Sequence, residues 1–185
     1  MRVYQLHFMA EVVGSASDQD LLDERHFAGR PFTGDWRRLQ LIVAGRSSSK
    51  LDFYRLGANA LACSERVRLE CGPLEDEGEF LPVRVRGLTG RFYLYNVTHC
   101  PSHLDPRKTI WNPYIPKGQP GCIRSPAFHV DRLGEDCVFK IPEDGASAIY
   151  CLERRDIPVH EGLRALVKRH RLTGLSFKLV WSDGK

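Results

Sequence analysis

Alternation of apolar and polar residues is the main regularity along this chain. In the segment 79–86, Leu81, Val83 and Val85 share one face, and the arginines between them point to the other face. A side-chain period of two is typical of a β-strand with one buried face. The segments predicted as strands, from alternation or from short apolar runs between turn residues, are 2–8, 38–43, 79–86, 91–97, 136–141, 147–151 and 175–181.

Two of these strands carry further information. Aromatic residues occur on both faces of 91–97, which predicts that this strand is buried on both faces. Pro82 has no N–H group to donate to a neighbouring strand. It therefore predicts either that 79–86 is an edge strand or that a strand starts there.

Helical periodicity is restricted to two segments. Apolar residues at i, i+3 and i+4 form a stripe within 159–171, and Ser64 is a suitable N-cap for a short helix over 64–71. Turn residues at 87–90 and 142–145 join consecutive strands. We therefore expect an α+β fold in one domain over residues 1–185. It should have a largely antiparallel sheet built from hairpins, few helices and one amphipathic helix near the C-terminus.

Regular patterning stops between residues 98 and 126, where six prolines occur. This long loop combines aromatic and cationic residues, the types that dominate protein–protein interfaces, and its prolines lower the entropic cost of ordering it on binding. We expect a partner-binding surface here, formed by Arg107, Lys108, Trp111, Tyr114 and Lys117. The alternative is that Trp111 folds back onto the core and pins the loop.

The predicted helix 159–171 offers a second cationic surface. Opposite its apolar stripe lie Arg164, Lys168, Arg169 and Arg171. This face could meet an acidic partner, or it could simply be a solvated face whose cations favour the C-terminal end of the helix dipole.

The composition narrows the class of protein. The chain has 185 residues, of which 42% are hydrophobic and 27% charged, so collagen-like and disordered classes are excluded. No apolar run reaches the roughly 18–20 residues of a membrane span, and residues 2–8 lack an apolar signal core. We expect a cytoplasmic protein with no membrane partner. Its net charge of +4 is spread along the chain, so we do not expect it to bind nucleic acid. No sequence feature predicts an oligomeric state.

The cysteines and histidines give no clear chemical motif. A disulfide framework belongs to secreted chains, so we expect free thiols at Cys63, Cys71, Cys100, Cys122, Cys137 and Cys151. Zinc ligand types occur at His99, Cys100, His103 and Cys122, but their spacing fits no ribbon or finger. We expect no metal and no cofactor. Without a nucleophile motif or a phosphate-cradling glycine loop, we also expect no catalytic residues and no enzyme.

Several short motifs follow one another in a characteristic order. They are Gly-Arg-Pro-Phe at 29–32, Asp-Trp at 35–36, Ser-Glu-Arg at 64–66, Gly-Glu-Phe-Leu-Pro-Val at 78–83, Tyr-Leu-Tyr-Asn-Val-Thr at 93–98, Leu-Asp at 104–105, Asp-Cys-Val-Phe-Lys-Ile at 136–141 and Leu-Thr-Gly-Leu-Ser-Phe at 172–177. In this order the chain resembles a bacterial immunity-protein family of polymorphic toxin systems. That family was first described from a myxobacterial protein and was formerly a domain of unknown function.

The resemblance implies an inhibitor that is not an enzyme. Such a protein binds a cognate toxin made by the same cell and blocks it. The proline-rich stretch 106–121 is not part of the resemblance, so the expected binding surface rests on composition alone. The alternative reading of the sequence is a small enzyme or a nucleic-acid-binding domain of unknown specificity.

Overall fold

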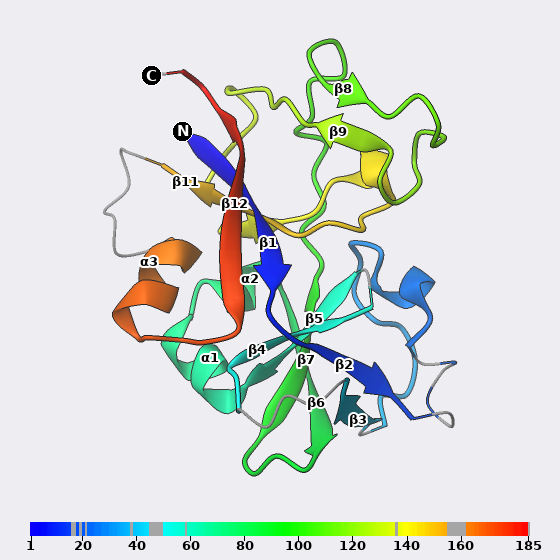
Figure 1. Cartoon of the computed structure of the whole chain (residues 1–185), viewed down its shortest axis with the longest axis vertical. Helices are drawn as coiled ribbons and strands as arrows, with labels where there is room; N and C mark the ends of the chain where they lie inside the picture. The colour runs from blue at the N-terminus through cyan, green and yellow to red at the C-terminus, as the bar shows by residue number, and fades with distance from the viewer. Residues whose placement is uncertain are drawn as a thin grey trace.

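The strands form a closed barrel, an open sheet and a small two-stranded sheet (Figure 1). The computed structural model describes residues 1–15, 18, 20, 22–37, 39–44, 50–57, 59–135, 137–154 and 162–184, with the side chains of residues 24 and 25 excepted. The strands are β1 (Arg2–Phe8), β2 (Glu11–Gly14), β3 (Leu39–Val43), β4 (Phe53–Leu56), β5 (Ala60–Ser64), β6 (Gly78–Arg86), β7 (Phe92–Val97), β8 (Ile110–Trp111), β9 (Ile123–Ser125), β10 (Val138–Phe139), β11 (Tyr150–Glu153) and β12 (Leu175–Ser182). The helices are η2 (Glu24–Phe27), α1 (Glu65–Glu70), α2 (Leu74–Glu77), η3 (Pro142–Asp144) and α3 (Leu163–Arg169), where η marks a 3₁₀-helix.

Six strands close the barrel in the order β2-β3-β6-β7-β5-β4. Closure needs two parallel pairs, β2 with β4 and β3 with β6, and the other pairs are antiparallel. Because side chains alternate along each strand, one residue in two points inward. Tyr54 and Phe92 meet inside, with ring centroids 6.2 Å apart, and Ala60 and Ala62 leave room for these rings.

The open sheet, in the order β10-β11-β1-β12, covers one side of the barrel. Its inner face packs with the outer face of β5 and β7 and with the three α-helices. Buried members of this cluster include Tyr4, Leu6, Cys63, Tyr95 and Val167. Strand β7 therefore has core on both sides, which confirms the burial expected from its aromatic pattern.

The other face of the open sheet packs against the chain between β7 and β10. Phe128 fills this contact, and its ring lies 5.9 Å from the rings of Phe139 and Tyr150 and 5.8 Å from that of Trp181. Leu104 pairs with Phe128 in an isolated β-bridge. The long proline-rich segment is thus attached to a third hydrophobic cluster.

Four of the sequence motifs converge at one end of β6 and β7. The amide of Asn96 donates hydrogen bonds to Glu79 Oε1 (2.8 Å) and to the carbonyl oxygen of Arg30 (2.9 Å). The N–H of Phe32 donates to the same Glu79 oxygen (2.6 Å), and the indole N–H of Trp36 donates to a backbone carbonyl of β6 (3.0 Å). These residues tie the segment 29–36 to the barrel.

Lys140 is a buried cation that joins the sheet to the barrel end. Its side chain is 0% exposed, and its amine donates to the carbonyl oxygens of Phe27 (2.5 Å) and Asn59. Burial lowers the pKa of Lys140 to about 8. The backbone N–H of Lys140 also donates to the carbonyl of His99 (2.9 Å).

The expected α+β class with few helices is confirmed, and several element predictions need correction. The strand predicted at 136–141 is only Val138–Phe139, with residue 136 outside the described part. The helix predicted at 159–171 begins at Leu163 and ends at Arg169, and residues 155–161 lie outside the described part. Residue 38, the first of the predicted strand 38–43, also lies outside it.

The prediction of an edge strand at Pro82 is wrong, because β6 lies between β3 and β7. Pairing with β3 begins only at Val83, so the missing N–H of Pro82 costs no bond to β3. The loop 98–126 also contains β8 and β9, which the sequence pattern did not predict. Within the described residues no helix is long and apolar enough to cross a membrane.

Candidate functional site

The expected binding surface lies on a projection that we call the lobe, residues 105–127. Its two ends are fastened together by hydrogen bonds. The N–H of Asp105 donates to the carbonyl of Ala127 (2.7 Å), and the N–H of Ala127 donates to Thr109 Oγ1 (3.1 Å). The Thr109 hydroxyl donates to the carbonyl of Asp105 (2.8 Å). The lobe is therefore a closed excursion with a fixed base.

Turns and contacts to η3 hold the inside of the lobe. The N–H of Asn112 donates to the carbonyl of Cys122 (2.8 Å), and the N–H of Tyr114 donates to Asn112 Oδ1 (3.1 Å). The carbonyl of Glu143 accepts from the N–H of Gly118 (3.0 Å) and from the thiol of Cys122 (3.2 Å). Backbone bonds of this kind position the lobe relative to the open sheet.

Two of the five predicted surface residues contact each other. The Lys117 ammonium lies 4.3 Å from the centre of the Trp111 ring, a cation–π contact. Trp111 itself is half-buried, packs against the third hydrophobic cluster and donates its indole N–H to the carbonyl of Pro106 (3.3 Å). Part of the ring therefore packs on the core, as the alternative expected, and part of it remains at the surface.

The other three predicted residues do not join this contact. Tyr114 is 85% exposed. Arg107 is exposed at the surface, and the Lys108 ammonium lies 3.5 Å from the carboxylate of Asp105. Lys108 is therefore paired with a carboxylate at the base of the lobe.

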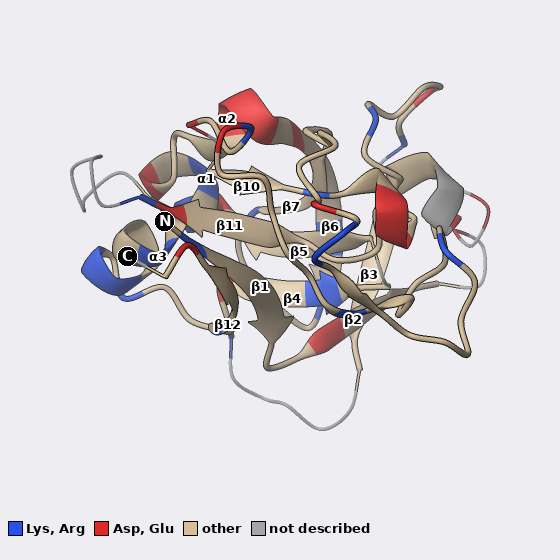
Figure 2. Ribbon diagram, turned by 90° about the horizontal axis from the view of Figure 1, so that it is seen from above, with Lys and Arg blue, Asp and Glu red and all other residues tan. Residues whose placement is uncertain are grey.

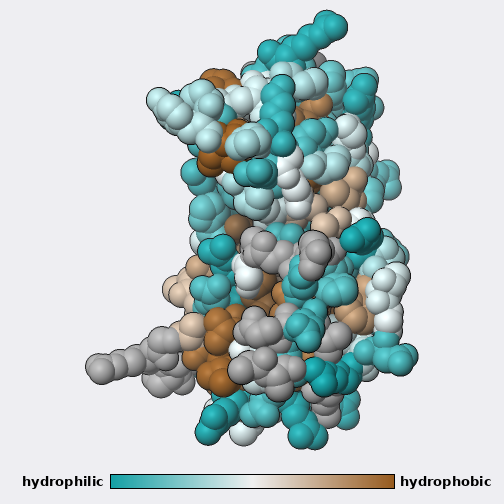
Figure 3. Space-filling model, turned by 90° about the vertical axis from the view of Figure 1, so that its right-hand side faces the viewer, coloured by the Kyte–Doolittle hydropathy of each residue, from teal (hydrophilic) through white to brown (hydrophobic). Residues whose placement is uncertain are grey.

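Ile110 is a surface residue that the sequence analysis missed. It begins β8, next to Trp111, and is 58% exposed. Figure 3 shows apolar surface in the upper part of the molecule, where the lobe lies. Composition alone could not identify Ile110, because an isoleucine side chain is normally assigned to the core.

The second cationic surface, on α3, is reduced by pairing. Arg164 forms an ion pair with Glu153 (2.6 Å), and its guanidinium carbon lies 4.0 Å from the centre of the Tyr4 ring. Lys168 and Arg169 are exposed at the last turn of the helix (Figure 2). Within the part of the chain that the structure describes, α3 therefore resembles a solvated helix face more than a binding site.

The four candidate zinc ligands take separate roles. His99 Nδ1 lies 3.7 Å from Glu77 Oε2, and the His103 ring packs edge-on against Phe139, with centroids 5.4 Å apart. The thiol of Cys122 is directed at a backbone carbonyl. Among the described residues, no three His, Cys, Asp or Glu side chains are grouped so that they could hold a metal ion.

All six cysteines carry free thiols in this structure, and all but Cys100 are buried. Burial raises the pKa of Cys100 to about 11 and the pKa values of Cys71 and Cys137 to about 12. Because the thiolate is the reactive form, these side chains are poor nucleophiles at neutral pH.

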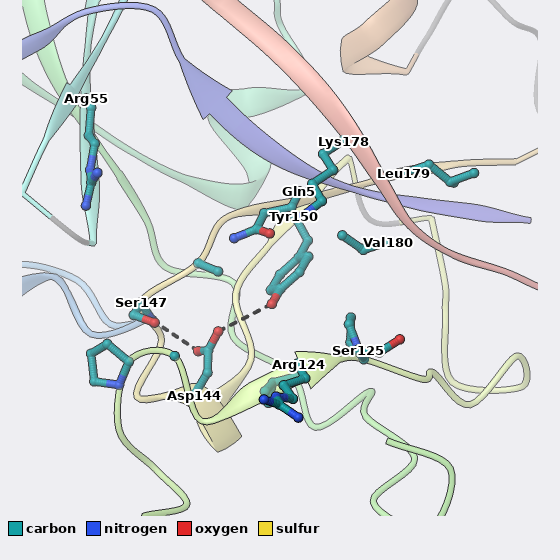
Figure 4. Close-up of a pocket in the computed structure, with 15 residues that line it drawn as sticks. Gln5, Arg55, Arg124, Ser125, Asp144, Ser147, Tyr150, Lys178, Leu179 and Val180 are labelled. Atoms are coloured by element: carbon teal, nitrogen blue, oxygen red, sulfur yellow. Dashed lines mark hydrogen bonds between the residues drawn. The ribbon is translucent and has the colours of Figure 1, made fainter. Parts of the chain in front are cut away.

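A cleft of about 400 Å³ lies between the lobe, the η3 turn and the open sheet (Figure 4). Asp144 on η3 is 3% exposed. Its carboxylate accepts hydrogen bonds from the N–H of Ser147 (3.1 Å) and the hydroxyl of Tyr150 (3.4 Å). Burial raises the pKa of Asp144 to about 6. In the sequence, Asp144 is recognisable only as part of a turn motif.

Comparison of the chain with known protein families and with curated proteins finds no match.

Proposed function

We propose that this protein is a non-enzymatic immunity protein that binds and neutralises a cognate bacterial toxin, with the lobe as its binding surface. The observation that carries the proposal is the exposure of Ile110 and Tyr114, 58% and 85%, on a lobe whose base is closed by backbone hydrogen bonds. Large side chains held out on an ordered segment lose little entropy when a partner covers them. Tyrosine is also among the residues that most often anchor interfaces.

The charge of the lobe favours a partner with an acidic surface. Arg107 and Lys117 are exposed beside the anchors, and Lys117 also holds the Trp111 ring. Complementary potentials speed the encounter of two proteins and disfavour wrong partners. Because Lys117 is already in contact with an aromatic ring, its side chain loses little conformational entropy when a partner binds.

The toxin part of the proposal is supported by the ordered motifs. Three of them meet in the hydrogen-bonded cluster of Arg30, Phe32, Glu79 and Asn96, and a fourth joins β6 through the indole N–H of Trp36, so they act as one structural unit of the barrel. A shared scaffold with a variable projecting segment suits a family whose members bind different partners, because loops carry recognition while the scaffold fixes their position.

The proposed function expects a neighbouring gene to encode a toxin, and the test is co-expression with the protein that this gene encodes. We expect the wild-type chain to restore growth and to co-purify with that protein. Tyr114→Ala should weaken binding at least tenfold, because truncating an interface anchor costs about 2 kcal/mol, roughly thirtyfold in Kd. Leu69→Ala is the matched control, since Leu69 is 76% exposed on α1, outside the lobe.

Absence of both rescue and complex would overturn the proposed function. A complex that forms equally well with the Ile110→Ser/Tyr114→Ala variant would retain the function and refute the lobe as its binding surface. Both side chains are exposed, so the variant is expected to keep the wild-type melting temperature.

A further inference from the structure

The lining of the cleft beside the lobe has an excess of positive charge. It carries three cations, Arg55, Arg124 and Lys178, against the single carboxylate of Asp144. The Arg55 guanidinium donates to the carbonyl of Gly57 (2.8 Å). Arg124 and Lys178 are exposed at the rim, and neither has an ion-pair partner among the described residues.

The two rim cations come from different parts of the fold. Arg124 lies on β9 of the lobe and Lys178 on β12 at the edge of the open sheet. In Figure 4 they lie on opposite sides of Tyr150. A ligand that engages both cations therefore needs anionic groups at two separated positions.

The surface between the cations is mixed, with polar side chains beside the apolar side chains of Ile123, Leu179 and Val180. Gln5 lies beside Tyr150 in Figure 4, and Ser125 and Ser147 also line the cleft. Hydroxyl and amide groups of this kind donate and accept hydrogen bonds, so they suit a ligand that carries hydroxyls. The Asp144 carboxylate already accepts hydrogen bonds from two donors of the protein, and its single negative charge is outnumbered by the three cations of the lining.

The volume of about 400 Å³ sets the size of the ligand. Pockets for small organic molecules begin at about 300 Å³, and a single inorganic phosphate would fill only a small part of such a space. Arginine and lysine are the usual partners of phosphate and carboxylate groups.

We propose that this cleft binds a small polyol that carries anionic groups at both ends, as a sugar bisphosphate does. Its terminal groups pair with Arg124 and Lys178, and its hydroxyls bond to the polar side chains between them. This site is distinct from the Ile110 and Tyr114 surface, so the inference stands whether or not the lobe binds a toxin.

The probes are fructose 1,6-bisphosphate and ribulose 1,5-bisphosphate, titrated by calorimetry at constant ionic strength. Glucose 6-phosphate, with one anionic group, and glucose, with none, are compared under the same conditions. We expect at least one bisphosphate to bind at least tenfold more tightly than glucose 6-phosphate, and glucose not to bind. A ligand that binds only the folded state also raises the melting temperature, which gives a second readout.

The variant Arg124→Gln/Lys178→Gln should weaken bisphosphate binding at least tenfold, and each single substitution should give part of that loss. The matched control is Arg84→Gln/Arg86→Gln, which removes two exposed cations from β6 outside the cleft and should leave binding unchanged. The inference is refuted if neither bisphosphate binds, or if binding persists in the Arg124/Lys178 variant. Equal losses in both double variants would show general charge attraction, which also refutes a site.

Discussion

The buried carboxyl group of Asp144 allows a quantitative prediction for the pH dependence of stability. Burial is the main cause that raises its pKa to about 6, from an ordinary value of 3.8, and the nearby Glu143 carboxylate adds to the effect. Hydrogen bonds from Ser147 and Tyr150 oppose the shift without cancelling it. The perturbation is Asp144→Asn, which keeps an oxygen acceptor for the Ser147 N–H and removes the charge.

The magnitude follows from the difference between the two pKa values. Between pH 3.8 and 6 the folded protein holds a proton on Asp144 that the unfolded chain has released. The free energy of unfolding therefore falls as the pH rises through this window. Two pKa units correspond to about 3 kcal/mol, because each unit is 1.36 kcal/mol. The stabilisation that comes from the proton on Asp144 is fully present below the unfolded-state pKa of 3.8 and is lost above the folded-state pKa of about 6.

The assay is urea unfolding of the wild-type protein and the variant between about pH 4 and pH 8, analysed with a common slope. Subtracting the two curves removes the other titrating groups, so only the Asp144 contribution remains. The Asp144→Asn variant should gain stability relative to wild type as the pH rises, by about 3 kcal/mol over the whole window.

Asp105 serves as a control of opposite sign. Burial alone would raise the pKa of Asp105. The opposing effects together are larger: they are hydrogen bonds from the backbone N–H groups of Arg107 and Lys108, and nearby positive charge. The pKa of Asp105 is therefore lowered. Asp105→Asn should therefore lose stability relative to wild type as the pH rises through the acid range. A difference curve for Asp144→Asn that is flat, or that has the slope expected for Asp105→Asn, would refute the reasoning.

Three further predictions concern the core and the thiols. Phe92→Ala should destabilise the protein by about 3–5 kcal/mol in urea unfolding, because the ring is buried inside the barrel; a loss below 1 kcal/mol would show that the barrel is not packed around it. Lys140→Met should lower the free energy of unfolding by about 1–3 kcal/mol, because two buried backbone carbonyls lose their shared donor. The control Lys178→Met changes an exposed lysine and should have little effect on stability. Cys100 should be the first thiol to react with a disulfide reagent in the folded protein, and the five buried thiols should react only on unfolding; a melting temperature that drops on adding reductant would contradict free thiols.

The strands that the sequence predicted well are long. Strands β1, β6 and β12 have seven to nine residues, enough for a period of two to be recognised. Strands β2 and β4 have four residues each. Strand β5 is buried along its whole length, so its sequence Ala-Leu-Ala-Cys-Ser shows no alternation. Closure of the barrel depends on the parallel pairs β2–β4 and β3–β6. A local sequence pattern does not predict which distant strands pair.

The candidate sites were predictable only in part. The lobe could be identified because proline, aromatic and cationic residues are unusual together in one loop. The contact between Trp111 and Lys117 depends on the turns between them, and the exposure of Ile110 depends on how β8 is held. Lys140 was predicted within a strand, where an alternating pattern would direct a lysine to solvent, yet its amine is enclosed by two carbonyl groups. The cleft joins residues from both ends of the chain and has no sequence signal.

The pairing of β1 with β11 and β12 constrains the order in which the chain acquires its structure during translation. The ammonium group of Met1 lies 2.6 Å from the Asp183 carboxylate, across 182 positions of sequence. The barrel uses strands between residues 11 and 97, so it can close early, whereas β1 has no partner until β11 leaves the ribosome. At 5–20 residues per second, that delay is roughly 10–30 s. Throughout this delay the apolar side chains of β1 that are buried in the folded protein, Val3 and Leu6 among them, lack their partner strands, and exposed apolar surface of this kind makes a nascent chain prone to aggregation.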